Sequence, residues 1–372
     1  MIIGNISRAA ALALLALASV SAAGADDFDI KISNFDVQAT PLMQPAPQFP
    51  GQGIARGQEG WVRMNFVVTA EGRVVDPIVI DSSGGAVFEQ SALAAVKDWQ
   101  FESPISELFN NSADIRFQYS RGRDRATSAF ERRYRRIVTD LHFERPQDAR
   151  KEIDSTVAHG GWNLYESAML WLMIGRVEGA EGNHAAKLEN YRRSLALSNR
   201  SILDGNDRCN LLSKLFELEI EHAQYASARQ TFRQLRKEPA GGRQTATARG
   251  DAAVIDRLIH GNEPISAKAT IYNPCDCDAG KPLWSYVPAR RTFSFSSLNG
   301  NVERFEVRCE NERFSDSIAT DKLWSLPEDS GSCRVFVFGD DGASFDFVEH
   351  SDDKPAEEVG STVVAWIDVL DR

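Results

Sequence analysis

The stretch WVRMNFVVTAEGRVVDPIVID, residues 61–81, decides the fold of the most informative part of this chain. Apolar residues alternate with other residues from Val62 to Val68, and this two-residue period is typical of a half-buried strand. Residues 70–73 have the composition of a tight turn, and residues 74–81 form a second apolar run. The sequence therefore predicts a β-hairpin.

A helix and a third strand are expected after the hairpin. Residues 26–44 are mixed in composition, and only residues 29–32 have the pattern of a short strand. Ile115, Phe117 and Tyr119 alternate along the third strand. Four apolar residues at helical spacing predict the amphipathic helix between them: Phe88, Ala92, Val96 and Trp99. The local architecture is β-β-α-β, a small α+β layer.

Residues 45–119 resemble the C-terminal domain of the TonB energy-transducer family. The resemblance rests on the alternating first strand and on many residues in the same order rather than on one motif. These residues are Phe49-Pro50, where the family usually has Tyr-Pro, then Ala55, Gly57, Gly60, Gly72, Ser82-Ser83-Gly84, Ala92, Val96, Trp99, Phe101 and Pro104. We therefore expect a TonB-like domain over residues 26–120.

The resemblance implies a binding mode for this domain. In the family, the domain captures a short extended segment of an outer-membrane transporter by adding it as a strand beside the sheet. The third strand matches the place of the receiving edge, where open backbone groups pair with the partner. The residues expected to bind the partner are Ile115, Arg116, Phe117, Gln118 and Tyr119. Ile115 and Phe117 are also expected to pack under Trp99 and Phe88, since edge pairing uses the backbone.

Composition limits the class of protein. The chain has 372 residues and a formal net charge of -11, with 42% hydrophobic and 26% charged residues. This apolar fraction excludes disorder throughout, and the length suffices for two or three domains. The acidic balance argues against nucleic acid as the main ligand. Residues 310–372 hold 16 acidic and 5 basic residues, so this region carries the whole imbalance.

The N-terminus has the pattern of an exported protein. Arg8 closes a weakly basic start, an apolar run covers residues 9–18, and residues 23–25 offer a small-residue cleavage site. The run is shorter than the roughly 20 residues that span a bilayer. We therefore expect a cleaved signal peptide over residues 1–25 and a periplasmic protein. An uncleaved anchor, with the chain on the periplasmic side of the inner membrane, is the alternative.

Five cysteines in an exported chain favour disulfide pairing. Cys309 with Cys333 is the first choice, because each lies in a β-like run that neighbouring strands can bring together. Cys209 is expected to be left over, and the pairing of Cys275 and Cys277 stays open. A zinc site built from the four C-terminal cysteines is the alternative, although the Cys-x-Cys spacing departs from the usual Cys-x-x-Cys.

The middle of the chain, residues 121–262, is rich in Ala, Leu, Glu and Arg and contains a loose repeat. Residues 182–199 resemble the second helix of a tetratricopeptide repeat, and residues 223–237 repeat the pattern. A degenerate copy centres on Ala149. We predict two or three stacked helical hairpins, followed by a linker of Gly, Thr and Ala at residues 239–249.

A short helix over residues 252–260 is expected to lead into an all-β domain over residues 263–372. Turn signals at residues 299–300 and 340–342 separate its strands, and residues 362–370 are a candidate last strand. The strands are predicted from alternating runs at residues 267–272, 291–296, 302–309, 333–339 and 343–349. This pattern favours a small sandwich that contains the disulfide.

Motifs for catalysis, cofactors or metals are missing from the sequence. The six His residues are scattered, and neither a Gly-x-Ser-x-Gly elbow nor a Walker loop nor a dinucleotide-binding turn occurs. The densest carboxylates, at residues 352–358, lack the regular spacing of a calcium loop, so a solvated acidic loop is the preferred interpretation. We therefore expect a non-enzymatic protein with no cofactor and no metal.

Together these features predict a multidomain chain with an α+β TonB-like unit, an all-α region of helical-hairpin repeats and a C-terminal all-β domain. The expected function is a periplasmic TonB-family module that captures an extended segment of an envelope protein or a TonB-dependent outer-membrane receptor, linked to TonB-dependent transmembrane transport. The alternative is a periplasmic scaffold or adaptor that acts through its helical repeats without energy transduction. In that alternative the TonB-like unit pairs within the protein or with itself.

Overall fold

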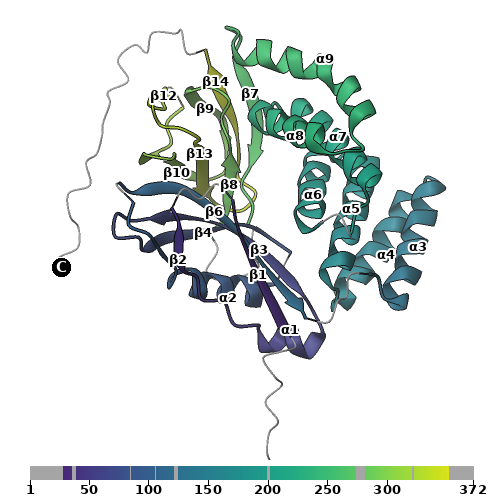
Figure 1. The fold of residues 1–372 in the computed structure, drawn as a ribbon. Coiled ribbons are helices and arrows are strands. Elements are labelled where there is room, and N and C mark those ends of the chain that lie inside the picture. The colour runs from purple at the N-terminus through teal and green to yellow at the C-terminus, as the bar shows by residue number, and fades with distance from the viewer. Residues whose placement is uncertain are drawn as a thin grey trace, which may run out of the picture.

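The computed structural model consists of a sheet with two helices, a row of helices and a two-sheet region (Figure 1). It describes residues 28–35, 39–83, 85–104, 106–120, 125–198, 202–273, 281–320 and 322–351. Several expectations lie outside the described residues: the signal peptide at residues 1–25, the pairing of Cys275 and Cys277, the acidic loop at 352–358 and the strand at 362–370.

The N-terminal part is built on a four-stranded antiparallel sheet in the order β1-β6-β3-β4, called the N-terminal sheet below. Its elements are β1 (Phe28–Phe35), β2 (Pro41–Met43), α1 (Gly51–Arg56), β3 (Gly60–Val68), β4 (Val74–Ser82), α2 (Ala86–Val96), β5 (Gln100–Phe101) and β6 (Leu108–Tyr119). β2 pairs with β5, and α2 packs on one face of the sheet. The predicted β-β-α-β order is present as β3, β4, α2 and β6.

The predicted hairpin is formed by β3 and β4. Gly72 in its turn has a φ of 77°, and a Cβ atom there would lie 2.0 Å from the carbonyl oxygen of Phe101, so this position requires glycine. Alternate residues of β3 pack against α2 in one core, which includes Val62, Met64, Phe66, Phe88, Ala92, Val96 and Trp99. The residues that alternate along β3 and the residues at helical spacing in α2 therefore pack together in one core.

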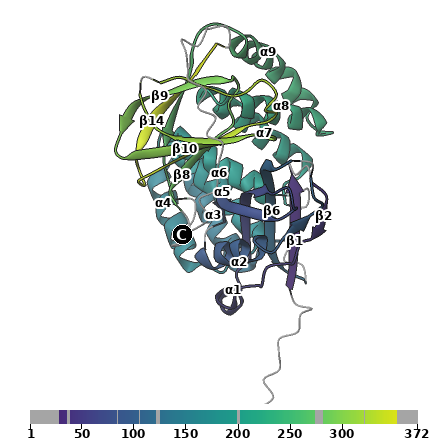
Figure 2. The same cartoon turned by 90° about the vertical axis from the view of Figure 1, so that its left-hand side faces the viewer.

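The third predicted strand, β6, lies inside the N-terminal sheet between β1 and β3. The expectation that residues 115–119 form an open edge is therefore wrong. The strand expected at residues 29–32 is longer than the sequence indicated, and as β1 it pairs with β6 over eight residues. Figure 2 shows β1 beside β6.

The middle of the chain is helical. It contains α3 (Ser128–His142), α4 (Pro146–His159), α5 (Leu164–Ala180), α6 (His184–Leu197), α7 (Gly205–Glu221), α8 (Tyr225–Lys237) and α9 (Gly242–Ile259). α3 packs with α4, α5 with α6, and α7 with α8. The segments around Ala149, at 182–199 and at 223–237 are each the second helix of such a pair. Helical hairpins are therefore present, and their assignment as tetratricopeptide repeats stays a prediction.

The linker predicted at residues 239–249 is wrong. α9 begins at Gly242 and contains the short helix expected at 252–260. Ala248, Ile255 and Ile259 are buried in one cluster with residues of α7 and α8. The Gly, Thr and Ala composition hides this helix, because a helix in a protein is stabilised mainly by the packing of one face and less by local propensity.

The C-terminal part is a sandwich of two four-stranded sheets, β11-β10-β13-β8 and β12-β9-β14-β7. Phe293, Phe305 and Phe347 belong to the aromatic core that both sheets share. The strands are β7 (Ile265–Thr270), β8 (Leu283–Tyr286), β9 (Thr292–Asn299), β10 (Val302–Arg308), β11 (Arg313–Ser317), β12 (Trp324–Ser325), β13 (Arg334–Gly339) and β14 (Ser344–His350). The five alternating runs of the sequence correspond to β7, β9, β10, β13 and β14.

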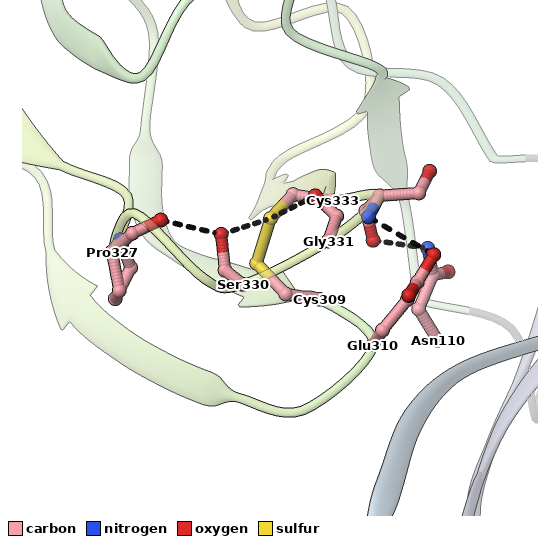
Figure 3. The surroundings of a disulfide bond; sticks show 8 residues. Asn110, Cys309, Glu310, Pro327, Ser330, Gly331 and Cys333 are labelled. Atoms are coloured by element: carbon pink, nitrogen blue, oxygen red, sulfur yellow. Dashed lines mark hydrogen bonds between the residues drawn. A yellow bond between two sulfur atoms is a disulfide. The ribbon is translucent and has the colours of Figure 1, made fainter.

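A disulfide joins Cys309 and Cys333, as expected (Figure 3). Cys309 follows β10 and Cys333 precedes β13, and these two strands are antiparallel neighbours. Cys209 is free and buried in α7. Because Cys309 and Cys333 bond to each other, the alternative zinc site of four cysteines is wrong.

The three parts meet on the face of the N-terminal sheet that points away from α2. β3 is buried on both faces. Trp61 packs against Leu164 and Leu197 of the helical part, and Asn65 accepts a hydrogen bond of 2.9 Å from Arg308 of the sandwich. Both other parts therefore cover this face. None of the helices in the described ranges combines the length and the apolar character needed to cross a membrane.

Candidate protein-binding site

The β6 residues predicted to bind a partner are divided between the two faces of the N-terminal sheet. Ile115 and Phe117 are fully buried on the side of α2, and the ring of Phe117 lies 5.1 Å from that of Phe88. The expected packing of these two side chains is thus confirmed. The ring of Tyr119, on the same side, lies 5.3 Å from that of Phe28 in β1.

β1 forms an antiparallel ladder with β6 that starts at Phe28 opposite Tyr119 and covers eight residue pairs. Ile30 and Ile32 of β1 are half-buried against the same core as α2. An extended segment therefore lies beside β6 with its apolar side chains directed into the core, and this segment belongs to the chain itself.

The other face of β6 carries Arg116 and Gln118. Arg116 Nη2 donates a hydrogen bond of 2.5 Å to the carbonyl oxygen of Ala196, near the end of α6, where the helix dipole favours a cation. Burial lowers the pKa of Arg116, and the nearby Asp114 opposes this effect. Gln118 is half-buried and lies opposite Asp29 of β1. Arg116 therefore connects the sheet to the helical part.

Lys31 of β1 lies directly opposite Arg116 in the ladder. Like charges at directly opposite positions of two strands destabilise their pairing. Lys31 forms an exposed ion pair of 3.4 Å with Asp29 in its own strand, and exposed pairs of this kind contribute little to stability. The backbone of β1 thus pairs with β6 along the whole strand, but the side chains of Lys31 and Arg116 place two like charges opposite each other.

Glu59 is a residue of this site that the sequence analysis missed. It is 4% exposed, and its carboxylate accepts hydrogen bonds from the backbone N–H groups of Tyr119, at 3.0 Å, and Leu164, at 2.7 Å. Glu59 therefore binds the end of β6 and the start of α5 together. Its local sequence, between Gln58 and Gly60, resembles a solvated loop and carries no signal for this role.

Two ion pairs lie on the face away from α2, one within the N-terminal sheet and one between the sheet and α6. Arg63 donates two hydrogen bonds to Asp114 at 2.8 and 2.9 Å, and Asp81 accepts one of 2.8 Å from Arg193 of α6. Burial raises the pKa of Asp81 although Arg193 opposes this effect. The pKa of Arg63 is raised, because Asp114 outweighs the effect of burial.

Within the ranges that the structure describes, no cluster of three or more His, Cys, Asp or Glu side chains is placed to hold a metal ion. The charged side chains of the site are instead bound within the N-terminal sheet, as Arg63 is to Asp114, or between the sheet and the helices, as Asp81 is to Arg193. This arrangement can bind an extended backbone and join parts of a protein, which are the tasks of a binding module.

Residues 45–120 match the family model described as the Gram-negative bacterial TonB protein C-terminal. The resemblance of this segment to the TonB C-terminal domain is therefore confirmed. The match includes β6 but ends before β1 is reached on its N-terminal side, so the strand that lies on β6 comes from outside the matched segment.

Three curated relatives cover the same part of the chain. The chain is 34% identical to Protein TonB of Pseudomonas aeruginosa over 71 residues, which are 19% of this chain and 21% of that protein. It is 40% identical to Protein tonB2 of the same organism over 60 residues, 16% and 22% of the two chains. It is 34% identical to Protein TonB of Vibrio cholerae over 70 residues, 19% and 29% of the two chains.

The chain therefore spans less than a third of the length of these curated relatives. Among solved structures, the solution NMR structure of the Pseudomonas aeruginosa TonB CTD is 25% identical. That match covers 28% of this chain and 94% of the solved chain, with a TM-score of 0.19.

Proposed function

We propose that this chain is a non-enzymatic periplasmic module that binds proteins and acts in TonB-dependent transport. In this proposal a signal peptide over residues 1–25 exports the chain, residues 26–120 form the TonB-like domain, residues 121–262 carry tetratricopeptide-like repeats and residues 263–372 form the β domain. The partner is a protein with an extended segment, such as a TonB-dependent outer-membrane receptor. The similarity of residues 45–120 to TonB C-terminal domains supports the role in transport.

The observation that carries the binding mode is the ladder between β1 and β6. A strand from outside the matched segment pairs with β6 over eight residues, so the geometry of this position suits an extended backbone. In this proposal the partner's segment takes the place of β1 and pairs with the backbone of Ile115–Tyr119. The side chains of Ile115, Phe117 and Tyr119 then receive its apolar residues, and Arg116 and Gln118 face its other side.

Exchange of β1 for a partner strand restores the backbone hydrogen bonds, so its free energy depends on the difference in side-chain contacts. Displacement of β1 loses the half-buried contacts of Ile30 and Ile32. It also separates Lys31 from Arg116, which removes the repulsion between these two like charges. An occupied edge reduces the apparent affinity for the partner in proportion to the fraction of molecules whose edge is open. β1 therefore sets how strongly a competing segment must bind.

The test is to fix β1 on β6 covalently. Asp29→Cys and Gln118→Cys replace two residues that are directly opposite in the ladder, and mild oxidation joins them. The probe is a fluorescent synthetic peptide with the β1 sequence FDIKISNF, and fluorescence anisotropy measures its binding to the full chain. We expect the peptide to exchange with β1 in the unmodified chain and not in the crosslinked chain.

Matched controls isolate the effect of the crosslink. Each single-cysteine variant, oxidised in the same way, is expected to bind the peptide as the unmodified chain does. A peptide with proline at the position of Ile32 lacks a backbone N–H group and is expected to bind poorly. Equal binding by the crosslinked chain and the single variants, or no binding by any form, would falsify the exchange of β1.

A scaffold or adaptor is the second candidate, because β1 closes the edge of β6 and the other two parts cover the face away from α2. In that case binding depends on the surface of the helical hairpins. Site-specific photocrosslinking in cells separates the two proposals. A partner captured from Gln118 of β6, which stays in the sheet when β1 is displaced, supports strand exchange. A partner captured only from exposed positions of the helices supports the scaffold.

A further inference from the structure

A cavity of about 350 Å³ lies where the three parts of the chain meet. The N-terminal sheet contributes Arg63 and Asp81 to its wall, the helices contribute Arg192 and Glu219, and the sandwich contributes Trp284. This volume is near the lower end of the range for small-molecule sites, about 300–1,000 Å³. The cavity is distinct from the β6 edge, so it does not depend on the strand-binding proposal.

The charges in the centre of the wall are already paired within the protein. Arg192 of α6 donates hydrogen bonds of 3.0 Å to both Glu189 and Glu219, and it also donates to Gln224. Burial raises the pKa of Glu219 although Arg192 opposes this effect. The carboxylate of Glu219 is therefore largely removed from water, and its counter-charge is supplied by the chain.

The same holds at the rim of this charged centre. Asp81 accepts its hydrogen bond from Arg193, and Arg208 donates one of 2.8 Å to Glu238. Arg63 is held by the two hydrogen bonds from its guanidinium to Asp114. A ligand with a net charge would compete with these pairs or remain unpaired, and an unpaired buried charge is strongly unfavourable. The wall thus favours an uncharged ligand.

Neutral polar groups add hydrogen-bonding capacity to the wall. α8 places Ser227, Gln230, Thr231 and Gln234 along the cavity at helical spacing. Gln230 and Gln234 are exposed and therefore mark the side that is open to solvent. Hydroxyl and amide groups both donate and accept hydrogen bonds, as the hydroxyl groups of a sugar do.

The sandwich adds an aromatic contribution to the wall. The rings of Trp284 and Tyr286 are stacked, with centroids 5.0 Å apart and planes inclined by 13°. The hydroxyl of Tyr286 is bound to Glu349 and to the carbonyl oxygen of Ala223, so its polar end is not available. Both residues are almost fully buried in the core of the sandwich, so only a small apolar area of Trp284 is left to contact the C–H groups of a ligand.

We propose that this cavity binds an uncharged, polyhydroxylated small molecule, a neutral sugar. Such a ligand contacts all three parts of the chain at once. Because it binds only when they are assembled, it also stabilises their arrangement.

Isothermal titration calorimetry on the full chain tests this proposal. Maltose and N,N′-diacetylchitobiose are the neutral probes, and glucose 6-phosphate and glucosamine are the anionic and cationic ones. We expect at least one neutral probe to bind about tenfold more tightly than both charged probes. Binding of neither neutral probe, or equal or tighter binding of a charged probe, overturns the proposal.

Two variants of α8 locate the site. Gln230→Trp narrows the open side from an exposed position and is expected to weaken binding of the neutral probe by about tenfold. Arg236→Trp, at an exposed position of α8 outside the cavity wall, is expected to leave it unchanged. Thermal unfolding of both variants verifies that each is folded. Unchanged binding by Gln230→Trp, or equal weakening by both variants, places the sugar elsewhere and also overturns the proposal.

Discussion

Arg308 of the sandwich donates a hydrogen bond of 2.9 Å to the side-chain oxygen of Asn65 in β3. Arg308 is 1% exposed, although it is an arginine. It also donates to the carbonyl oxygen of Asp76, at 3.0 Å, and to the carboxylate of Glu306, at 2.6 Å. The sandwich and the N-terminal sheet therefore share a buried polar network, and their association depends on its being complete.

Arg308→Ala is expected to lower the free energy of unfolding by about 3–5 kcal/mol, because it leaves a buried carboxylate with one of its cations removed. Arg308 and Arg313 together hold the pKa of Glu306 below its ordinary value, although burial opposes them. Urea unfolding followed by circular dichroism measures the loss. Arg135→Ala, which breaks an exposed pair with Glu131 on α3, should cost less than about 1 kcal/mol. Equal losses in the two variants would contradict this prediction.

Trp61→Ala is expected to weaken the connection between the N-terminal sheet and the helices. Trp61 is fully buried against Leu164, Ala168 and Leu197, and removal of a buried Trp side chain costs about 3–5 kcal/mol. Differential scanning calorimetry should show a lower transition temperature and a broader or divided transition, since the two parts lose a shared contact. Trp61→Phe retains much of the buried area and should show a smaller change. A single transition at the unchanged temperature for Trp61→Ala would sink this idea.

The parts of the fold that could be predicted are those with a local period. The hairpin and the helix α2 follow from alternation and helical spacing, because one buried face determines both. The helix ends at Val96, so Trp99, which the sequence placed in it, follows the helix and joins the same core. The turn that contains Gly72 could be predicted from the composition of residues 70–73. The pairing of β1 with β6 could not be predicted, since it joins Phe28 to Tyr119 and depends on contacts that no local pattern records.

The candidate site shows the same limit. The five β6 residues could be named from the resemblance, but the sequence did not show that β1 covers their edge or that Arg116 reaches Ala196. Glu59 was missed because its partner Leu164 is 105 residues away. Charged residues near glycines usually lie in solvated loops, so a buried carboxylate that binds two backbone N–H groups becomes visible only in three dimensions.

The disulfide between Cys309 and Cys333 is expected to stabilise the sandwich. It closes a segment of 24 residues, for which the loss of unfolded-state entropy corresponds to about 3 kcal/mol. Dithiothreitol should therefore lower the transition temperature of the wild-type chain. The double variant Cys309→Ala/Cys333→Ala should start from the lower temperature and not respond to the reductant. A response of the double variant equal to that of the wild type would show that the reductant acts elsewhere.

Glu349 at the joint of the sandwich and the helices is fully buried. Burial raises its pKa to about 7, although hydrogen bonds from Tyr286 and from the backbone N–H groups of Arg290 and Ala289 oppose the effect. Arg290 in turn donates to the last carbonyl groups of α9, including that of Ile259 at 2.9 Å. The ionisation state of Glu349 therefore affects the stability of the contact between the sandwich and the helices.

Because the pKa of Glu349 is raised from 4.5 to about 7 on folding, the folded chain holds a proton that the unfolded chain has lost between these pH values. The contribution to stability is therefore complete below about pH 4.5 and is lost as the pH rises through 7, by roughly 3 kcal/mol in all. Glu349→Gln removes this dependence. Urea unfolding of both chains at four pH values between about 4.5 and 8 should show the variant gaining stability relative to wild type as the pH rises, and parallel curves would contradict the assignment.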